Sequence, residues 1–198
     1  MTIEEWRRVL WSDESPFVLI YNGRKLVWRL GNERYSITCC TGTVKHDIKI
    51  MVWGCFAAHG VGNLYLVEGI MEQVQYRTIL ENQLLPSAER LFPGEAWYFQ
   101  QDNDPKHTAN ATKQYMIDNQ IPILPWPSQS PDLNPIENLW SILDYKLRNR
   151  RPQNQQQLFE ALTEGWNSLD RELLTNLADS MPRRIQAVLE KRDYPTKY

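Results

Sequence analysis

Three acidic residues have the types and positions that metal-dependent chemistry requires. Asp13 ends the first predicted strand, in "RRVLWSDE", and Asp102 directly follows another, in "AWYFQQD". Glu137 lies in the first turn of a later predicted helix, in "NPIENLW". If the two strands are neighbours, their acids emerge side by side and the helix can bring Glu137 to them. Three converging carboxylates bind hard divalent cations, and two such ions about 3.5–4 Å apart activate a water or hydroxyl against a phosphodiester.

Two of these acids have ordinary structural explanations as turn residues. Asp13 and Asp102 could each bond to neighbouring backbone after a strand, as Asp readily does. Asp104 is a better structural candidate, because Asp104 and Pro105 are typical of a helix N-cap and first helical residue. Since such roles are common, only the three acids together favour an active site.

Glu137 has an alternative role at the start of its helix. Asn134, Pro135 and Glu137 match the N-cap, first and third helical positions of a capping-box pattern. The two roles are compatible, because fixing the helix start also fixes where Glu137 points. Whether Glu137 caps the helix without metal stays open. Trp126 and Trp140 flank this acid and are expected to be its packing walls rather than base-stacking platforms.

A mixed five-stranded sheet covered by helices on both faces is predicted to position the acids. The first strand is followed by a long basic excursion, a hairpin of two strands, and then two strands linked through helices. This α/β layout is that of an RNase H-like domain. The segments after the excursion are "KIMVWGCFA", "NLYLVEG", a helix over about 72–90, "AWYFQQ", a helix to about 118, "IPIL", a helix over 136–147 and a mostly helical tail from 154.

Composition indicates one soluble, intracellular domain. The 198 residues, with 42% hydrophobic content, suffice for one core, so a single domain over 1–198 is expected. The sequence shows neither a charged-then-apolar leader nor an apolar run near 18 residues, so no secretory signal or membrane span is expected. The three cysteines lack C-x-x-C spacing and favour idle thiols: Cys39, Cys40 and Cys55.

Charge and motif patterns exclude several classes of protein. The net charge is −2, yet 22–49 holds six basic residues against two acids, and a second basic cluster spans 146–151. Such clusters are commonly solvated faces and do not by themselves establish a polyanion partner. There is no G-x-S-x-G, P-loop or dinucleotide-binding motif. "DNDPKHTANATK" fails as a calcium loop, because His107 and Lys113 stand where an EF-hand needs Gly and Glu.

Three long motifs in order give a specific resemblance. "WSDES", "FQQDNDPKHTA" and "WPSQSPDLNPIENLW", with 34 residues between Asp102 and Glu137, closely resemble the catalytic domain of mariner-superfamily transposases, in particular the Sleeping Beauty-like branch. "VWGCFAAHGVGNLYLVEGIM", "RRP" and the terminal "TKY" extend the likeness over essentially the whole chain.

The resemblance implies a DDE-type enzyme that cuts DNA at transposon ends and joins the freed 3′ hydroxyls to TA-containing target DNA. It implies that Asp13, Asp102 and Glu137 are the catalytic, metal-binding residues, with two Mg²⁺ ions that Mn²⁺ can replace. The excursion then corresponds to a clamp loop that contacts DNA and a partner subunit. A homo-oligomer on double-stranded DNA, acting in the nucleus, is expected, with no membrane partner.

Basic residues near the acids are the candidate DNA contacts. Lys106 can help hold DNA, and His107 could contact a phosphate or be a structural histidine. Three arginines follow Glu137 by three to four helical turns and could grip a duplex backbone. The full set is Arg24, Lys25, Lys45, Lys106, His107, Arg148, Arg150 and Arg151.

Two departures from the family pattern stand out. Lys45-His46 is followed by Asp47-Ile48-Lys49 rather than by a glycine-rich run, which affects the expected flexibility of this segment. The paired helix-turn-helix modules that recognise transposon ends are also missing before the first strand, so a fragment or a truncated product is expected. Two alternatives share the fold: a domesticated, non-cutting DNA- or protein-binding module, and a nuclease without strand transfer.

Overall fold

A four-stranded mixed sheet forms the centre of the molecule. The structure, a computed structural model, describes residues 1–19, 47–128, 130–148 and 150–191. The strands lie in the order β3-β2-β1-β4, with bounds β1 Val9–Leu19, β2 Ile48–Ala57, β3 Gly60–Val67 and β4 Tyr98–Gln100. β1 pairs antiparallel with β2 and parallel with β4, and β2 pairs antiparallel with β3. This arrangement confirms the predicted α/β fold class.

The predicted fifth strand, "IPIL", is reduced to a single bridge. Ile123 pairs parallel with Phe99, through hydrogen bonds from Phe99 N to Pro122 O and from Leu124 N to Phe99 O, both 2.7 Å. Prolines at 122 and 125 flank this bridge, and proline has no N–H with which to extend a ladder. The sheet therefore has four strands among the described residues.

β1 is longer than predicted, because it runs through Asp13 instead of ending there. Its register with β2 continues from Trp11, opposite Phe56, to Leu19, opposite Ile48. β4 pairs only with Val9 to Trp11. Asp13 therefore lies just past the point where β1 loses one neighbour, which gives its side chain access to a pocket without ending the strand.

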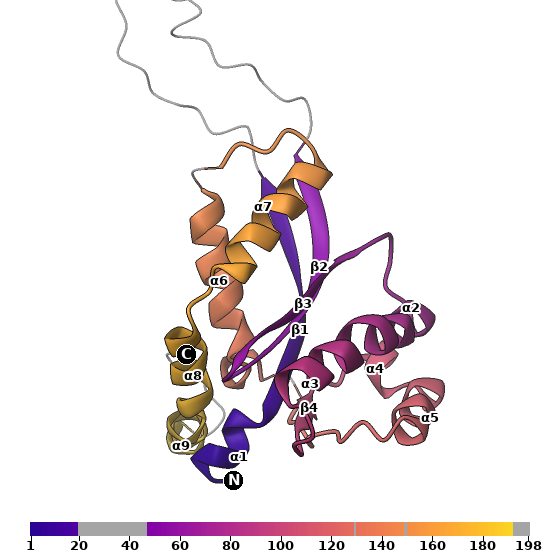
Figure 1. Cartoon of the computed structure of the whole chain (residues 1–198), viewed down its shortest axis with the longest axis vertical. Coiled ribbons are helices and arrows are strands. Elements are labelled where there is room, and N and C mark those ends of the chain that lie inside the picture. The colour runs from indigo at the N-terminus through magenta and orange to yellow at the C-terminus, as the bar shows by residue number, and fades with distance from the viewer. Residues whose placement is uncertain (20–46, 129, 149, 192–198) are drawn as a thin grey trace, which may run out of the picture.

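Helices cover both faces of the sheet (Figure 1). α6 and α7 lie along one face, with α1, α8 and α9 at its lower end, and the helices from α2 to α5 lie on the other side. Their bounds are α1 Ile3–Arg7, α2 Gln73–Ile79, α3 Leu85–Leu91, α4 Pro105–Thr108, α5 Asn110–Asp118, α6 Ile136–Leu147, α7 Gln155–Asn167, α8 Arg171–Asp179 and α9 Met181–Lys191, with a π-helical turn at Leu80–Leu84 and a 3-10 turn at Pro131–Leu133.

Two apolar cores result from the alternation of side chains along the strands. Trp11 and Val52 belong to the core under α6 and α7, whereas their neighbours Leu10 and Trp53 belong to the core under α2 and α3. Successive strand residues point to opposite faces, so a sheet covered on both sides needs apolar residues on both. This explains why the central strands carry apolar runs.

The helix after Asp102 begins as predicted but is broken. The Asp104 side chain accepts a hydrogen bond from Lys106 N at 3.0 Å, and Pro105 is the first helical residue, which confirms the predicted N-cap. The expected continuous helix to about 118 is wrong, because Ala109 is extended, with φ −56° and ψ 141°, and separates α4 from α5.

Two compositional expectations can be compared with the described residues. In this part of the chain no helix is long and apolar enough to cross a membrane. Cys55 is a buried free thiol, while Cys39 and Cys40 lie outside the described residues.

Candidate active site

The three predicted acids line one pocket. It has a volume of about 110 Å³. Asp13 comes from β1, Asp102 follows β4, and Glu137 is the second residue of α6. The other residues of the wall are Gln100, Trp126, Pro127, Ser130, Pro131 and Asn134. Segments more than 120 residues apart in sequence thus bring three carboxyl groups to one place.

Asp13 is electrostatically strained in this pocket. Burial, followed by the nearby charges of Glu137 and Glu14, raises the pKa of Asp13 to about 8. A raised pKa of this origin means that the carboxyl group retains a proton where water and counter-charge are scarce. A cation placed among these acids would lower the pKa of Asp13 again.

Asp102 is held ionised by its neighbours. Its Oδ1 accepts hydrogen bonds from His107 Nδ1 at 2.6 Å and from Asp104 N at 3.0 Å. The bond from His107 is the largest cause of the lowered pKa of Asp102. Among the described residues both contacts use Oδ1, which leaves Oδ2 for a further ligand.

His107 links Asp102 to a second acid. The ring is buried, its Nε2 lies 3.2 Å from Glu14 Oε1, and its centroid lies 4.0 Å from that of Tyr76. Burial disfavours a charge on His107, but the bonds to Asp102 and Glu14 outweigh burial and raise its pKa to about 9. Protonated His107 therefore donates to both carboxylates.

Lys106 and His107 face protein carboxylates, although Lys106 was expected to help hold DNA and a phosphate contact was one of two alternatives for His107. Lys106 Nζ lies 2.8 Å from Asp104 Oδ2 and 3.3 Å from Glu14 Oε2. His107 is only 3% exposed, so a bound duplex cannot reach it without rearrangement. The structure therefore favours the alternative in which His107 is a structural residue.

Glu137 does not cap its helix, so the predicted capping box is wrong. Pro135 is the N-cap of α6 and no side chain caps this helix end. Asn134 Nδ2 instead donates to Ser12 O at 3.2 Å, and its Oδ1 accepts from Ile136 N at 3.4 Å. The two backbone N–H groups of a capping box are already used, because Glu137 N donates to Asn134 O at 3.3 Å and Asn134 N donates to Pro131 O at 3.0 Å. The Glu137 carboxylate is directed to the pocket instead of to its own backbone.

Glycine opposite Asp13 lets α6 approach the sheet. Gly54 pairs with Asp13 across β1 and β2. A Cβ built on Gly54 would lie 2.7 Å from Trp140 Cη2, well inside van der Waals contact. Trp140 also stacks on Trp166, with ring centroids 5.2 Å apart, and Trp126 packs edge-on against Trp11 at 5.6 Å. Both tryptophans that flank Glu137 are therefore packing walls, as predicted.

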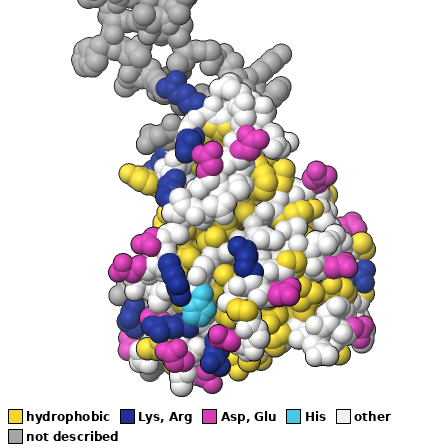
Figure 2. All heavy atoms as spheres, in the orientation of Figure 1, with side chains coloured by type: hydrophobic (Ala, Val, Ile, Leu, Met, Phe, Trp, Pro, Cys, Tyr) yellow, Lys and Arg dark blue, Asp and Glu magenta, His cyan; other side chains and the backbone are white. Residues whose placement is uncertain are grey.

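The three arginine candidates after α6 are not in the wall of the acid pocket. Arg148, Arg150 and Arg151 are exposed beyond α6, and Arg150 forms an ion pair with Glu164 at 3.1 Å. Figure 2 shows basic and acidic side chains interspersed on the visible face. Arg24, Lys25 and Lys45, with the predicted clamp loop, fall outside the described residues.

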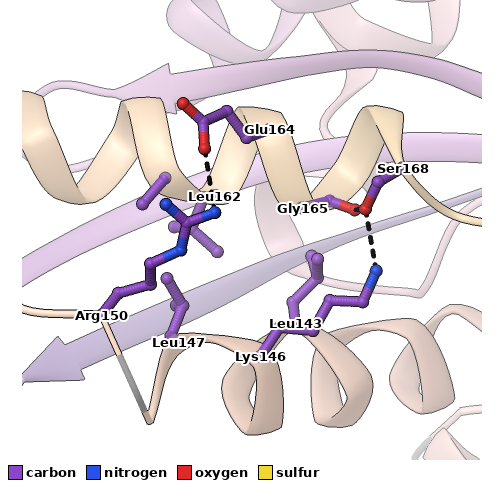
Figure 3. Close-up of a pocket in the computed structure, with 9 residues that line it drawn as sticks. Leu143, Lys146, Leu147, Arg150, Leu162, Glu164, Gly165 and Ser168 are labelled. Carbon is purple, nitrogen blue, oxygen red and sulfur yellow. Dashed lines mark hydrogen bonds and ion pairs between the residues drawn. The ribbon is translucent and has the colours of Figure 1, made fainter.

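A larger cavity, of about 460 Å³, lies between α6 and α7 and has none of the three acids in its wall (Figure 3). Its two basic residues point to partners across the cavity: Lys146 donates to Ser168 Oγ at 2.8 Å, and Arg150 pairs with Glu164. Leu143, Leu147 and Leu162 form much of the remaining wall. The volume of a cavity therefore does not by itself identify the candidate active site.

Several residues of the site have only a weak signal in the sequence. Glu14 directly follows Asp13, while Gln100 and Asn134 precede Asp102 and Glu137 within the same motifs. In the sequence alone each looks like an ordinary polar residue, because its contacts form only when the three elements pack together. Ser12 is buried beside them.

The donor set of the pocket fits a hard divalent cation. Three carboxylates from separate elements provide the oxygen ligands that Mg²⁺ and Mn²⁺ prefer. Among the described residues, no group of three or more His, Cys, Asp and Glu side chains is already arranged to hold a metal ion. The raised pKa of Asp13 next to Glu137 is the electrostatic feature that a cation would relieve.

Comparisons with known proteins identify the family. Residues 8–159 match the family described as DDE superfamily endonuclease. The chain is 42% identical to the Tc1 transposase of Caenorhabditis elegans over 197 residues, which are 98% of this chain and 72% of that protein. It is also 42% identical to the Tcb1 transposase of Caenorhabditis briggsae over 196 residues, which are 98% of this chain and 71% of that protein.

Solved structures of the Mos1 transposase share the fold. The mariner Mos1 paired-end complex with Mn has a TM-score of 0.80 at 21% identity, over 97% of this chain and 57% of that chain. The Mos1 catalytic domain with Mg has a TM-score of 0.76 at 19% identity, over 97% of this chain and 87% of that chain. The sheet, the acid-lined pocket and these likenesses agree, and the chain belongs to the Tc1/mariner family of DDE transposases, as a catalytic domain with an RNase H-like fold.

Proposed function

We propose that this domain cleaves phosphodiester bonds at transposon ends and transfers the freed 3′ hydroxyls into TA-containing target DNA. Asp13, Asp102 and Glu137 are the proposed catalytic and metal-binding residues. They would hold two Mg²⁺ ions, which Mn²⁺ can replace. One observation carries the proposal: in a member of the DDE family, acids from three separate elements line the same pocket.

Each acid has a distinct part in this proposal. Bound divalent ions would activate the attacking oxygen and stabilise charge on the leaving oxygen. Asp102, ionised and oriented by His107, offers a fixed oxygen ligand. Asp13 has to release a proton when a cation enters, because its pKa is raised to about 8 without one. Glu137 enters from the first turn of α6, so the start of this helix sets its approach.

The proposed partner is double-stranded DNA. Solved Mos1 structures of the same fold include a paired-end complex with the left transposon end and a strand transfer complex. We extend to this chain a homo-oligomeric assembly on DNA, with action in the nucleus. In this proposal residues 1–198 carry the chemistry, and helix-turn-helix modules recognise the end sequence.

The direct test is a combined excision and joining assay in Mg²⁺, with Glu137→Gln and Asp102→Asn as matched variants. Excised DNA and joined products for the unmodified protein, and neither for the variants, would support the proposal. Cleavage without joining of a supplied 3′ hydroxyl end would indicate a nuclease. No more cleavage by the unmodified protein than by Asp102→Asn would indicate a non-cutting binding module.

A further inference from the structure

Three uncharged polar residues connect the elements that carry the acids. Ser12 directly precedes Asp13, Gln100 lies two residues before Asp102, and Asn134 lies three residues before Glu137. The exposed fractions of Ser12, Gln100 and Asn134 are 3%, 0% and 6%. Polar groups with so little exposure are costly unless they are hydrogen-bonded, so their partners are informative.

Ser12 ties β1 to β4 at the end of their ladder. Its Oγ donates to Gln100 O at 2.9 Å, and its N donates to Gln100 Oε1 at 3.4 Å. The last pair of the β1–β4 register is Trp11 with Gln100. The serine therefore extends the link between the two strands by one residue, to the position next to Asp13. Since Gln100 Nε2 has no hydrogen-bond partner among the described residues, the contribution of Gln100 comes from its two oxygens.

Asn134 ties the start of α6 to the same serine. Its Nδ2 donates to Ser12 O at 3.2 Å, while its Oδ1 accepts from Ile136 N at 3.4 Å. One amide thus contacts both the first turn of α6 and the backbone of β1. The position of Glu137 relative to Asp13 depends on this contact.

We propose that Ser12, Gln100 and Asn134 form a positioning bridge that sets the spacing of the three carboxylates before a metal ion binds. This inference rests on the proposed function and assigns roles to residues outside the triad. The carboxyl groups of Asp13 and Glu137 line the same pocket, and like charges repel, so the acids alone would not keep a fixed spacing. Neutral hydrogen bonds hold the backbones together without adding charge that competes with the cation. Supporting contacts of this kind commonly change metal affinity by 10–100-fold when removed.

The test compares Ser12→Ala and Asn134→Ala with Thr175→Val in the purified 198-residue chain. Thr175 is a matched control, because its hydroxyl also donates to a backbone carbonyl, Ala58 O, at 2.9 Å, and it is not in the wall of the acid pocket. Each of the three substitutions should lower Tm by about 2–4 °C, the effect of one lost hydrogen bond in a domain of this size. The affinity for Mn²⁺, measured by electron paramagnetic resonance of the free ion, should fall about 10-fold or more for Ser12→Ala and Asn134→Ala, and stay unchanged for Thr175→Val.

Asn134→Ser provides a milder variant if Asn134→Ala does not fold. Serine keeps an oxygen near Ile136 N but is too short to reach Ser12 O, so it should weaken Mn²⁺ binding in the same way. Mn²⁺ affinity in the Ser12 and Asn134 variants equal to that of Thr175→Val would overturn the bridge. If the unmodified chain binds Mn²⁺ no better than Asp102→Asn, the proposed metal site itself is refuted, and the inference falls with it.

Discussion

The two sides of the acid pocket are supported by different chemistry. Asp102 is held by charge: His107 donates to it and to Glu14, and Lys106 pairs with Glu14 and Asp104. The segments that carry Asp13 and Glu137 are joined by neutral groups, through Ser12 and Asn134. The charged support joins the helix start after Asp102 to Glu14 of β1, and it depends on the protonation of His107. The neutral support joins distant elements and has no titrating group.

This difference explains the opposite pKa shifts of the two aspartates. Hydrogen bonding to His107 lowers the pKa of Asp102, whereas burial and the charge of Glu137 raise the pKa of Asp13 to about 8. The side of Asp102 already has cations of the protein itself. The side of Asp13 and Glu137 is where an added cation gains the most electrostatic stabilisation.

Removing an acid from either side should have the largest effect on activity. Asp102→Asn and Glu137→Gln should each lower the rate of DNA cleavage on the order of 10³-fold or more, because each removes a charged ligand from the proposed metal site. Single-turnover cleavage with Mg²⁺ measures this loss. Circular dichroism should show a folded protein in both cases. Near-normal cleavage by either variant would remove that acid from the proposed site.

The same two substitutions should change stability in opposite directions, and this distinguishes the two supports. Asp102→Asn removes the negative charge that pairs with buried, protonated His107, so it should lower Tm. Glu137→Gln removes a charge that disfavours ionisation of Asp13, so it should raise Tm of the metal-free protein, by about 2–4 °C at neutral pH for roughly 1 kcal/mol. A fall of Tm in both variants would mean that repulsion between Asp13 and Glu137 does not limit stability.

Breaking the charged support should have a smaller effect on activity than removing an acid. His107→Gln keeps one donor but loses the charge and the second contact, so Asp102 loses part of its orientation. We expect cleavage or Mn²⁺ affinity to fall about 10–100-fold. Unfolding stability should fall on the order of 3 kcal/mol, since buried His107 is replaced and the partly buried Glu14 loses one of its two cationic partners.

His59→Gln is the control for this change, because His59 is exposed. It should leave both cleavage and stability unchanged. If cleavage depends on the metal concentration in the same way in His107→Gln and in His59→Gln, the charged support does not orient Asp102.

The pH dependence of stability should also separate the two supports. Asp13 has a pKa of about 8 in the folded protein and about 3.9 in the unfolded chain. Between these two pH values the folded state binds more protons than the unfolded state, so stability falls as the pH rises. His107 has a folded pKa of about 9 and an unfolded pKa of about 6.5, so its contribution is present below 6.5 and is lost as pH rises through 9.

Thermal unfolding of the metal-free protein from pH 5 to 9 measures both contributions. Glu137→Gln should weaken the dependence of Tm on pH in the lower part of this range. His107→Gln should weaken it above about pH 6.5. Identical profiles for the two variants would contradict the assignment of different pH windows, which overlap only between about 6.5 and 8, to Asp13 and His107.

Local sequence patterns predicted the features that depend on neighbouring residues. The Asp104-Pro105 helix start, the apolar runs of β2 and β3 and the amphipathic face of α6 follow from residues next to each other in sequence. The motifs around the acids also placed Asp102 just after a strand and Glu137 in the first turn of a helix, as the structure has them.

The features that were missed depend on contacts between distant segments. β1 continues past Asp13 because β2 pairs with it, and nothing in "WSDES" reports that pairing. Asn134 looked like one half of a capping box, but its Oδ1 accepts from Ile136 N and its Nδ2 donates to Ser12 O, 122 residues away. The sequence left open whether His107 contacts a phosphate or is a structural histidine, and only the packing of Tyr76 and Glu14 around it decides between the two. Residue type fixed the chemistry of these groups, whereas tertiary packing decided their partners.

The smallest effect on the pocket is expected from Arg150, which lies outside both supports. Arg150→Ala should change unfolding stability by less than about 0.5 kcal/mol, because its ion pair with Glu164 is largely exposed, at 58% and 64% of the two side chains.

If Arg150 contacts a phosphate, Arg150→Ala should decrease the slope of log affinity against log salt for duplex binding by about 1. Glu164→Gln is the matched control, because it breaks the same ion pair but leaves the cation in place, so its slope should stay unchanged. Equal slopes for the unmodified protein and both variants would remove Arg150 from the DNA surface, and a change in Mn²⁺ affinity for Arg150→Ala would show that the pocket depends on more than its two supports.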